Sequence, residues 1–418
     1  MKDPEVIRRD SRYSRMDIPG FDYQARTRVL FGPGCVERVG ECARELPAQK
    51  VLLVTDPGIV AAGHAERVRR ILEAAGVATA VFDRVKENPT TRDVDVCLEA
   101  ARAAGIGALV GLGGGSSLDT AKGCNFLLTN GGRMQDYWGV GKATRPFLPF
   151  IAIPTTAGTG SECQSFALIA DADTHQKMAC GDSKAAARVA ILDPVLTCSQ
   201  PRSVTACTGI DALAHAVETA VTRRRNGLSM LFSREAFAVG HAGLPAVLDA
   251  PDDIPARGRM QWSAALAGMA IENSMLGAAH AAANPLTAHF GIVHGQAVGM
   301  LLPQVVRFNG EDEDARREYA ELASAAGLLR RADDAQAALN ALVARLESLL
   351  NLAGIPRSLA VAGVERSRIG TLAEEAAQQW TARFNPREMV AADFERLYVA
   401  AFERRGDGDL AVQGGPHL

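Results

Sequence analysis

The chain lacks any long uninterrupted run of hydrophobic residues, although hydrophobic residues make up 47% of its 418 positions. A helix that crosses a membrane needs about 18–20 consecutive apolar residues, so the sequence predicts no membrane span. The chain also lacks an excess of positive charge: 45 Lys and Arg residues face 48 Asp and Glu residues, for a net charge of −3. This balance removes the usual electrostatic basis for binding nucleic acid or an anionic membrane surface.

The eight cysteines contain no C-x-x-C pair, and most stand among small apolar neighbours. This distribution argues against a disulfide framework or a zinc knuckle, and predicts reduced core residues in a reducing compartment. Residues 1–24 form a polar leader that mixes Arg with Asp and Glu and lacks the apolar segment of a secretory signal. A transit peptide would avoid the acids, so we expect a cytoplasmic protein.

A chain of this length exceeds one ordinary hydrophobic core, so two domains are expected. In the first half, short apolar runs alternate with helical patterns, which predicts an α/β domain with a parallel sheet. The expected strands are residues 27–31, 51–56, 79–82, 108–112, 150–153, 166–170 and 187–192. Later residues show helical patterns at 205–223, 229–248, 258–275, 312–326, 332–353, 366–381 and 390–403. We therefore predict a Rossmann-like, dinucleotide-binding domain at 1–200 and an all-helical, metal-binding domain at 201–418.

A glycine-rich turn follows the expected strand 108–112 and reads Gly113-Gly114-Gly115-Ser116. Glycines let a ligand approach the backbone closely, and the N-terminus of the following helix favours a phosphate group. The sequence therefore predicts a phosphate-binding turn. The alternative is a purely structural helix start, in which Ser116 and Asp119 form a capping box.

Two further polar features follow expected strands. Asp56 could bond the ribose hydroxyls of a nucleotide and repel a 2′-phosphate, which would favour NAD over NADP; the alternative is a turn or cap aspartate before Pro57. Residues 155–162, Thr-Thr-Ala-Gly-Thr-Gly-Ser-Glu, are too rich in hydroxyls and glycine for a plain connection. We expect this Thr-rich loop to hydrogen-bond a nucleotide or a substrate.

Asp211 and His215 are four residues apart in an apolar helical segment, a spacing that places both side chains on one face. On its own, the pair also fits a simple hydrogen bond on a helix surface. Two histidines stand far downstream: His280 at the expected end of a helix, and His294 at the start of the next. One carboxylate and three imidazoles suit a divalent first-row metal, iron or zinc, with an open position for substrate.

Taken together, these segments resemble the iron-containing (group III) alcohol dehydrogenases, whose superfamily includes lactaldehyde reductase, butanol dehydrogenase and glycerol dehydrogenase. The resemblance covers about residues 25–405. It rests on motifs at 113–122, 153–162, 193–194, 209–215 and 267–270, the 14-residue interval from His280 to His294, and Asn-Pro-Arg at 385–387.

The resemblance implies an architecture like that of dehydroquinate synthase, with an α/β domain and an all-α domain. It implies Fe²⁺, with Zn²⁺ as the alternative, bound between the domains by Asp211, His215, His280 and His294. It implies NAD, less readily NADP, and a homodimer or larger homo-oligomer. The nucleotide contacts that it implies are Asp56, Asn88, Gly113, Gly114, Gly115, Ser116, Asp119, Thr155, Thr156, Thr159 and Lys177, the last on a strand after the Thr-rich loop.

The chain departs from the family pattern near the expected substrate. The family commonly has a second histidine four residues after His280, where this chain has Asn284. Because asparagine cannot shuttle a proton at neutral pH, we expect proton release through water, a ribose hydroxyl or another side chain. A phenylalanine common in the family is Ile271 here, which opens space by the nicotinamide. We expect Phe166, Ile271 and Asn284 to line the substrate pocket.

The implied reaction is reversible oxidation of a small alcohol to an aldehyde. The metal would act as a Lewis acid on the substrate oxygen while hydride passes between the carbinol carbon and the nicotinamide. The alternative is a metal- and NAD-dependent non-redox enzyme of the dehydroquinate synthase type. The complete set of one aspartate and three histidines, together with the Thr-rich loop, argues against that alternative, and also against a catalytically silent binding protein.

Overall fold

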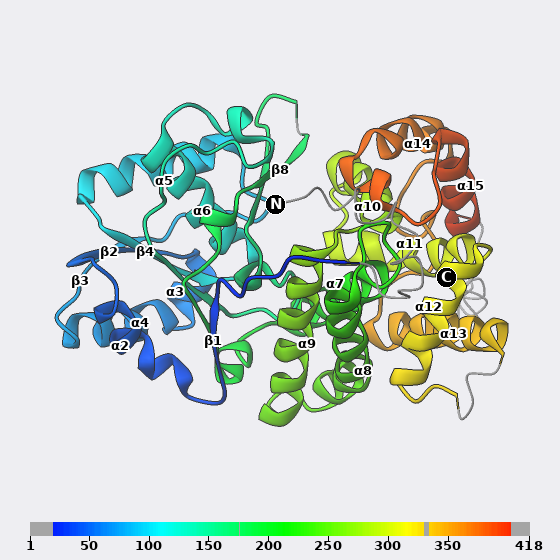
Figure 1. Cartoon of the computed structure of the whole chain (residues 1–418), viewed down its shortest axis with the longest axis horizontal. Helices are drawn as coiled ribbons and strands as arrows, with labels where there is room; N and C mark the ends of the chain where they lie inside the picture. Colours follow the sequence, from blue (N-terminus) through cyan, green and yellow to red (C-terminus); the bar gives the residue numbers. More distant parts are fainter. Residues whose placement is uncertain (1–19, 175, 330–333, 403–418) are drawn as a thin grey trace, which may run out of the picture.

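The computed structural model describes residues 20–174, 176–329 and 334–402. The described chain forms two parts that lie side by side, with strands in the first part and helices in the second (Figure 1). Most of the expected polar leader, residues 1–19, lies outside the described residues.

A six-stranded sheet with the order β1-β9-β6-β4-β2-β3 forms the centre of the first part, and all of its strand pairs are parallel. Strands β4, β6 and β9 are buried along their whole length, as expected for a parallel sheet covered on both faces. The predicted parallel α/β fold is thus confirmed. The strands are β1 (Arg28–Phe31), β2 (Lys50–Val54), β3 (Ala78–Phe82), β4 (Ala108–Gly113), β6 (Phe150–Pro154) and β9 (Val189–Leu192).

Helices cover both faces of this sheet. Successive residues of a strand point to opposite faces, so alternate residues of one strand belong to two different hydrophobic cores. Leu52 and Leu109 belong to one core with α5 and α6, whereas Val51 and Val110 belong to another with α2 and α4. Figure 1 shows α5 and α6 above the sheet, with α2 and α4 below it. The helices of this part are α2 (Val39–Arg44), α3 (Pro57–Ala61), α4 (His64–Ala74), α5 (Thr91–Ala104) and α6 (Gly115–Asn130).

A second, three-stranded sheet lies beside the first and was not predicted. It contains β5 (Gly139–Val140), β7 (Phe166–Ala170) and β8 (Lys177–Gly181), with β7 antiparallel to β8. The connection between β7 and β8 is short enough for an antiparallel pair, whereas a parallel pair needs a long crossover. The expected strand at 166–170 therefore exists but belongs to this small sheet.

Helices make up the second part, and among the described residues no helix is both long and apolar enough to cross a membrane. Helix α7 packs against α8, α9 and α11. The helices are α7 (Arg202–Thr219), α8 (Gly227–Asp249), α9 (Ile254–Asn273), α10 (Ala278–Phe290), α11 (His294–Asn309), α12 (Glu313–Ala325), α13 (Ala335–Ala353), α14 (Ile369–Gln378) and α15 (Ala391–Phe402).

One expectation about these helices is wrong. His280 was expected at the end of a helix, but α9 ends at Asn273 and a new helix begins at Ala278. The chain changes direction between them, where Met275 has a positive φ of 150°, a backbone conformation that no helix contains. His280 therefore lies in the first turn of α10.

The two parts meet where α9 packs directly on the Thr-rich loop. A Cβ atom added to Gly268 of α9 would lie 2.9 Å from the Cα of Gly160, and closer still to the carbonyl oxygen of that residue. Glycine inside a helix costs about 1 kcal/mol relative to alanine. The contact between the two backbones explains why glycine stands there.

A glycine-to-alanine pair in α9 tests this junction. We expect Gly268→Ala to lower the free energy of unfolding by about 1–3 kcal/mol, because the added methyl group would push α9 off the loop. Gly258→Ala, in the same helix, is the matched control, since its Cβ would meet no atom nearer than 3.5 Å. That control should leave stability unchanged or raise it by up to about 1 kcal/mol. Denaturant unfolding of both variants measures the difference, and equal midpoints would contradict the proposed packing.

Candidate functional site

Three of the four expected ligands form a tight buried group between α7 and α10. The Oδ1 atom of Asp211 lies 3.6 Å from Nε2 of His215 and 3.4 Å from Nε2 of His280. The two imidazole rings stack, with centroids 4.7 Å apart. One oxygen and two nitrogens from these residues all lie within 4.8 Å of one another, the arrangement of atoms that can share one ion.

His294, the first residue of α11, lies beside this group without belonging to its core of three atoms. Its ring centroid is 5.4 Å from that of His280, and the two rings are tilted by 55°. The next residue, Gly295, lets α11 begin against α7: a Cβ there would lie 2.8 Å from the carbonyl carbon of Cys207 and 3.3 Å from Cβ of Asp211. The structure thus brings all four predicted ligands to one place.

Unpaired polar atoms show that these residues fit a metal ion. Within the described part of the chain, the buried atoms Oδ1 of Asp211, Nε2 of His280 and Nδ1 of His294 have no hydrogen-bond partner. Buried polar groups nearly always have a partner, and leaving one unpaired costs about 1–3 kcal/mol. A divalent cation would satisfy the carboxylate and the imidazoles together.

Burial and neighbouring charges shift the pKa of each of the four residues in this group. Burial raises the pKa of Asp211, but the neighbouring histidines outweigh burial and hold it well below its ordinary value. Burial lowers the pKa of His215 to about 4 and, together with the charge of Lys177, lowers that of His294. Burial also lowers the pKa of His280, but the carboxylates of Glu218 and Asp211 outweigh it and raise this pKa to about 9. At neutral pH and without a metal ion, the group therefore holds an ionised carboxylate, two neutral imidazoles and a protonated His280, which would release the proton on Nε2 when a metal ion binds.

Sequence reasoning missed Glu218, a buried carboxylate next to the group. Its Oε2 atom is hydrogen-bonded with Nδ1 of His280, and its Oε1 atom accepts a hydrogen bond from the backbone N–H of Ala279 at 2.6 Å. The spacing in α7 could have revealed it, because residues 211, 215 and 218 follow at intervals of four and three along one helix face.

The glycine-rich turn opens α6 without a side-chain cap. Gly114 is the residue before the helix, and no side chain caps its first N–H groups. The alternative capping box of Ser116 and Asp119 is therefore wrong: Ser116 lies inside the helix, and its Oγ accepts a hydrogen bond from the N–H of Asn88 at 3.2 Å. A helix start without a side-chain cap suits an anion.

The Thr-rich loop packs directly on this turn. A Cβ at Gly114 would lie 3.2 Å from Cγ2 of Thr156, and one at Gly115 would lie 2.6 Å from Cγ2 of Thr159. The N–H of Thr155 donates to the carbonyl oxygen of Gly113 at 3.0 Å. The glycines are thus required by the close approach of the loop, and both segments meet at the carboxyl ends of the adjacent strands β4 and β6.

Asp56 follows β2 and lies beside the same turn. Its Oδ1 accepts the N–H of Ile59 at 3.1 Å, so the alternative that it caps a helix is confirmed. Its Oδ2 accepts a hydrogen bond from Oγ of Ser117 at 3.2 Å. In the sheet, β3 lies on one side of β2, whereas β4 and then β6 lie on the other side of β2. The strand order therefore reverses between β2 and β4. Ligands of open α/β sheets bind at such a switch point.

Asp119 has partners within the protein. Its carboxylate accepts hydrogen bonds from Oγ of Ser161 at 2.6 Å and from the N–H of Leu168 at 3.2 Å. The neighbouring Lys122 is fully buried, and its Nζ donates to the carbonyl oxygens of Ser161 and Phe166. These bonds fasten α6 to the end of the Thr-rich loop and to β7. The expected nucleotide contact of Asp119 stays a prediction.

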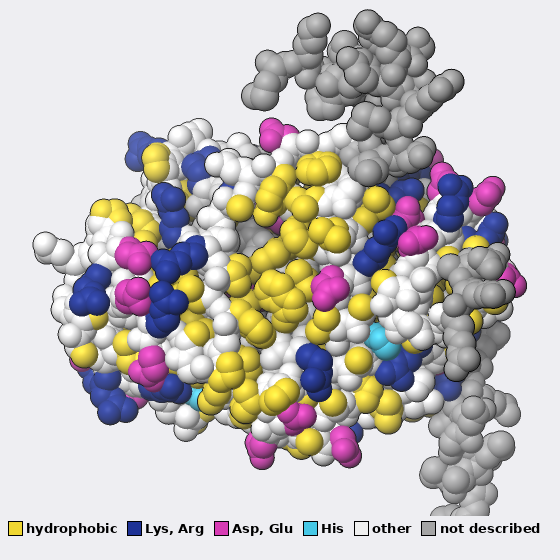
Figure 2. Space-filling model, turned by 60° about the horizontal axis from the view of Figure 1, so that its bottom comes forward, with side chains coloured by type: hydrophobic (Ala, Val, Ile, Leu, Met, Phe, Trp, Pro, Cys, Tyr) yellow, Lys and Arg dark blue, Asp and Glu magenta, His cyan; other side chains and the backbone are white. Residues whose placement is uncertain are grey.

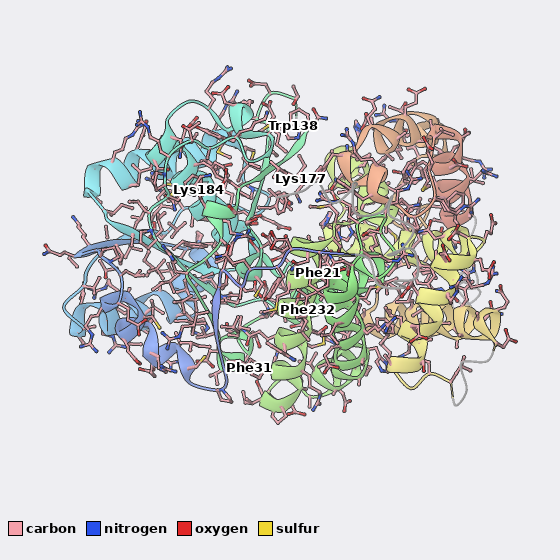
Figure 3. All side chains as sticks on the ribbon, viewed as in Figure 1. Phe21, Phe31, Trp138, Lys177, Lys184 and Phe232 are labelled. Atoms are coloured by element: carbon pink, nitrogen blue, oxygen red, sulfur yellow. The ribbon has the colours of Figure 1, made fainter. Side chains whose placement is uncertain are left out.

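Lys177 interacts electrostatically both with Asp119 of α6 and with the metal ligand Asp211. It begins β8, at the edge of the first part that faces the helical part (Figure 3). Burial lowers its pKa, whereas the carboxylates of Asp119 and Asp211 act in the opposite direction. Its amino group is thus within electrostatic range of both the helix that starts at the glycine turn and the metal ligands.

The three expected substrate-pocket residues lie on different elements. Phe166 begins β7, with its ring centroid 6.0 Å from that of Trp380. Ile271 is buried in α9. Asn284 lies one turn after His280 in α10, and its Nδ2 donates to Oε1 of Gln379 at 3.0 Å. Contact of these residues with a substrate stays a prediction.

Comparisons with known proteins agree with this geometry. Residues 26–194 match the family model described as "Iron-containing alcohol dehydrogenase", and residues 205–402 match "Fe-containing alcohol dehydrogenase family, C-terminal". The chain is 34% identical to alcohol dehydrogenase 4 of Schizosaccharomyces pombe, covering 92% of this chain and 88% of that one. It is 33% identical to NAD-dependent methanol dehydrogenase of Bacillus methanolicus, covering 88% and 96%. A crystal structure of 1,3-propanediol oxidoreductase has a TM-score of 0.88 and 31% identity, covering 92% and 100%.

Proposed function

Because the chain belongs to the iron-containing alcohol dehydrogenase family and is an oxidoreductase acting on CH–OH groups, we propose that it is an NAD-dependent, divalent-metal alcohol dehydrogenase and aldehyde reductase. The observation that carries the proposal is the buried group of Asp211, His215 and His280, with its unpaired atoms and His294 beside it. These four residues would hold Fe²⁺, or alternatively Zn²⁺. Such an ion would act as a Lewis acid toward the oxygen of a small alcohol or aldehyde.

The residues of the first part would bind and orient the nucleotide. The first N–H groups of α6 would hold the pyrophosphate, with Asn88, Thr155, Thr156 and Thr159 around it. Asp56 would bond the ribose hydroxyls. The buried surroundings of the ligands would exclude water during hydride transfer. Asn284 cannot accept the proton, because its amide does not titrate, so we propose that the proton leaves through water or a ribose hydroxyl.

Turnover and metal content test this proposal together. We expect protein purified without oxygen to hold one metal ion per chain, and to form NADH with members of a panel of primary alcohols and diols. His280→Ala should lose both metal and turnover, because it removes one of the three central ligands. Metal analysis and the absorbance of NADH provide the measurements. Full metal and full activity in His280→Ala would show that the site is wrong, and metal without net NADH formation would favour the dehydroquinate synthase type.

The choice of nucleotide depends on Asp56. Asn is as good a helix cap as Asp, so Asp56→Asn should keep α3 intact while it removes the negative charge. We expect kcat/KM with NADP to rise about fivefold relative to kcat/KM with NAD, the size of one repulsion of roughly 1 kcal/mol. Steady-state kinetics with both nucleotides measure this ratio. An unchanged ratio would mean that Asp56 acts only as a cap.

We also propose that the chain forms a homodimer or larger homo-oligomer. Hydrophobic side chains gather at the centre of one face (Figure 2), and Phe21, Tyr23 and Phe31 are 53%, 45% and 49% exposed. Among the described strands, β1 pairs only with β9 and so lies at the edge of the sheet, where a strand of another chain can pair. Light scattering should give at least twice the chain mass of 44.2 kDa, and Phe31→Asp should shift this mass toward that of one chain. A wild-type mass of one chain would contradict the proposal.

A cytoplasmic location completes the proposal. All eight cysteines are free, and five of them are buried, which suits a reducing compartment. Cell fractionation would test it.

A further inference from the structure

Glu218 makes two contacts that serve different purposes. It lies on α7 with only 3% of its surface exposed. One carboxylate oxygen accepts the backbone N–H of Ala279, and the other is hydrogen-bonded with Nδ1 of His280. A buried charge is costly unless hydrogen bonds compensate it, and this carboxylate obtains both of its bonds from the first turn of α10.

The start of α10 needs such partners, because Gly277 before it supplies no side-chain cap. Asn385 provides a second one: its Oδ1 accepts the N–H of Ala278 at 3.4 Å. A Cβ added to Gly277 would lie 3.2 Å both from this oxygen and from Oε1 of Glu218. Asn385 is itself fixed by a reciprocal amide pair with Asn309, at 3.0 and 2.8 Å. The first turn of α10 is therefore held by side chains from α7 and from the segment after α14.

Helix capping explains the contact made by only one of the two carboxylate oxygens of Glu218, the one that accepts the N–H of Ala279. A cap needs an acceptor for a backbone N–H, and the amide of Asn385 fills that role one residue earlier. The second oxygen of Glu218 instead faces a ring nitrogen. An ionised carboxylate can only accept hydrogen bonds, so Nδ1 of His280 must be the donor. The other nitrogen, Nε2, is then left to face Asp211 at 3.4 Å, with no hydrogen-bond partner within the described residues.

We propose that Glu218 is the positioning residue that holds His280 with its proton on Nδ1 and its Nε2 lone pair directed at the metal. This inference rests on the metal site proposed above. A carboxylate that accepts from the far nitrogen of a ligand histidine fixes the orientation of the ring and its tautomer, and removing such a carboxylate typically costs 10–100-fold in metal affinity. Here the same side chain also fixes the backbone that carries the histidine.

Glu218→Gln tests the tautomer separately from the packing. Glutamine has nearly the same shape, and its oxygen can still accept the N–H of Ala279. Its NH₂ group would then face Nδ1 of His280, which must become an acceptor and so carry its proton on Nε2. We expect Zn²⁺ affinity, measured by competition with a chromophoric chelator, to fall about 10–100-fold. The visible spectrum of bound Co²⁺ should also change, because an imidazole would leave its coordination.

Glu272→Gln is the matched control. The carboxylate of Glu272 also accepts a backbone N–H, that of Ser165 at 2.9 Å, and the hydroxyl of the same residue. No histidine is among the partners observed for it in the described structure. The same substitution there should leave Zn²⁺ affinity and the Co²⁺ spectrum unchanged. Circular dichroism of the metal-free variants shows whether each one is folded.

The outcomes separate this inference from the proposed function. If the wild-type protein binds neither Zn²⁺ nor Co²⁺, the proposed metal site is wrong. If the wild-type protein binds them, and folded Glu218→Gln binds them with the same affinity and spectrum, the positioning role is overturned while the metal site stands. Should Glu218→Gln fail to fold, Glu218→Asp replaces it. That carboxylate is one methylene shorter and cannot reach both partners, so wild-type affinity in Glu218→Asp would also overturn the role.

Discussion

The carboxylate of Asp211 is a negative charge buried in the protein interior, and the arrangement of three helices depends on it. Such a charge is stable only with compensation close by. His215 lies beside it on the same helix, whereas His280 and His294 stand at the beginnings of α10 and α11. Both helices must therefore start against α7. Gly295 and Gly277 make this possible, because a side chain at either place would meet α7 or its partners.

A second constraint joins the metal ligands to the glycine turn. The Thr-rich loop contacts the start of α6 at Gly115, and α9 at Gly268. It also reaches α7, since a Cβ at Gly158 would lie 2.6 Å from Cβ of Thr208, three residues before Asp211. A single loop thus sets the distance between the turn at the end of β4 and the ligands on α7. Hydride transfer requires fixed placement of two reactants, so the close packing of this loop on α6, α7 and α9 supports the proposed chemistry.

The parts of the fold that the sequence predicts are those with a strong local pattern. Buried strands such as 108–112 are continuous apolar runs, and the spacing of Asp211 and His215 places them on one helix face. The wrong or missing parts depend on contacts between distant segments. The pattern of Ser116 and Asp119 fits a capping box, but Asn88 and Ser161 bind these side chains instead. The helical spacing of Glu218 from Asp211 and His215 is visible in the sequence. Its contacts with Ala279 and His280 become apparent only in the structure, where α10 packs against α7.

Amide pairs, which carry no charge, hold α10 on two sides. Asn385 and Asn309 fix its start, and Asn284 bonds Gln379 one turn after His280. Amide side chains do not titrate, so these contacts keep α10 in place at any pH at which the protein is folded. A histidine at position 284 would add a charge that changes near neutrality, close to His280. With asparagine there, these two contacts of α10 carry no charge and do not depend on the protonation of the metal ligands.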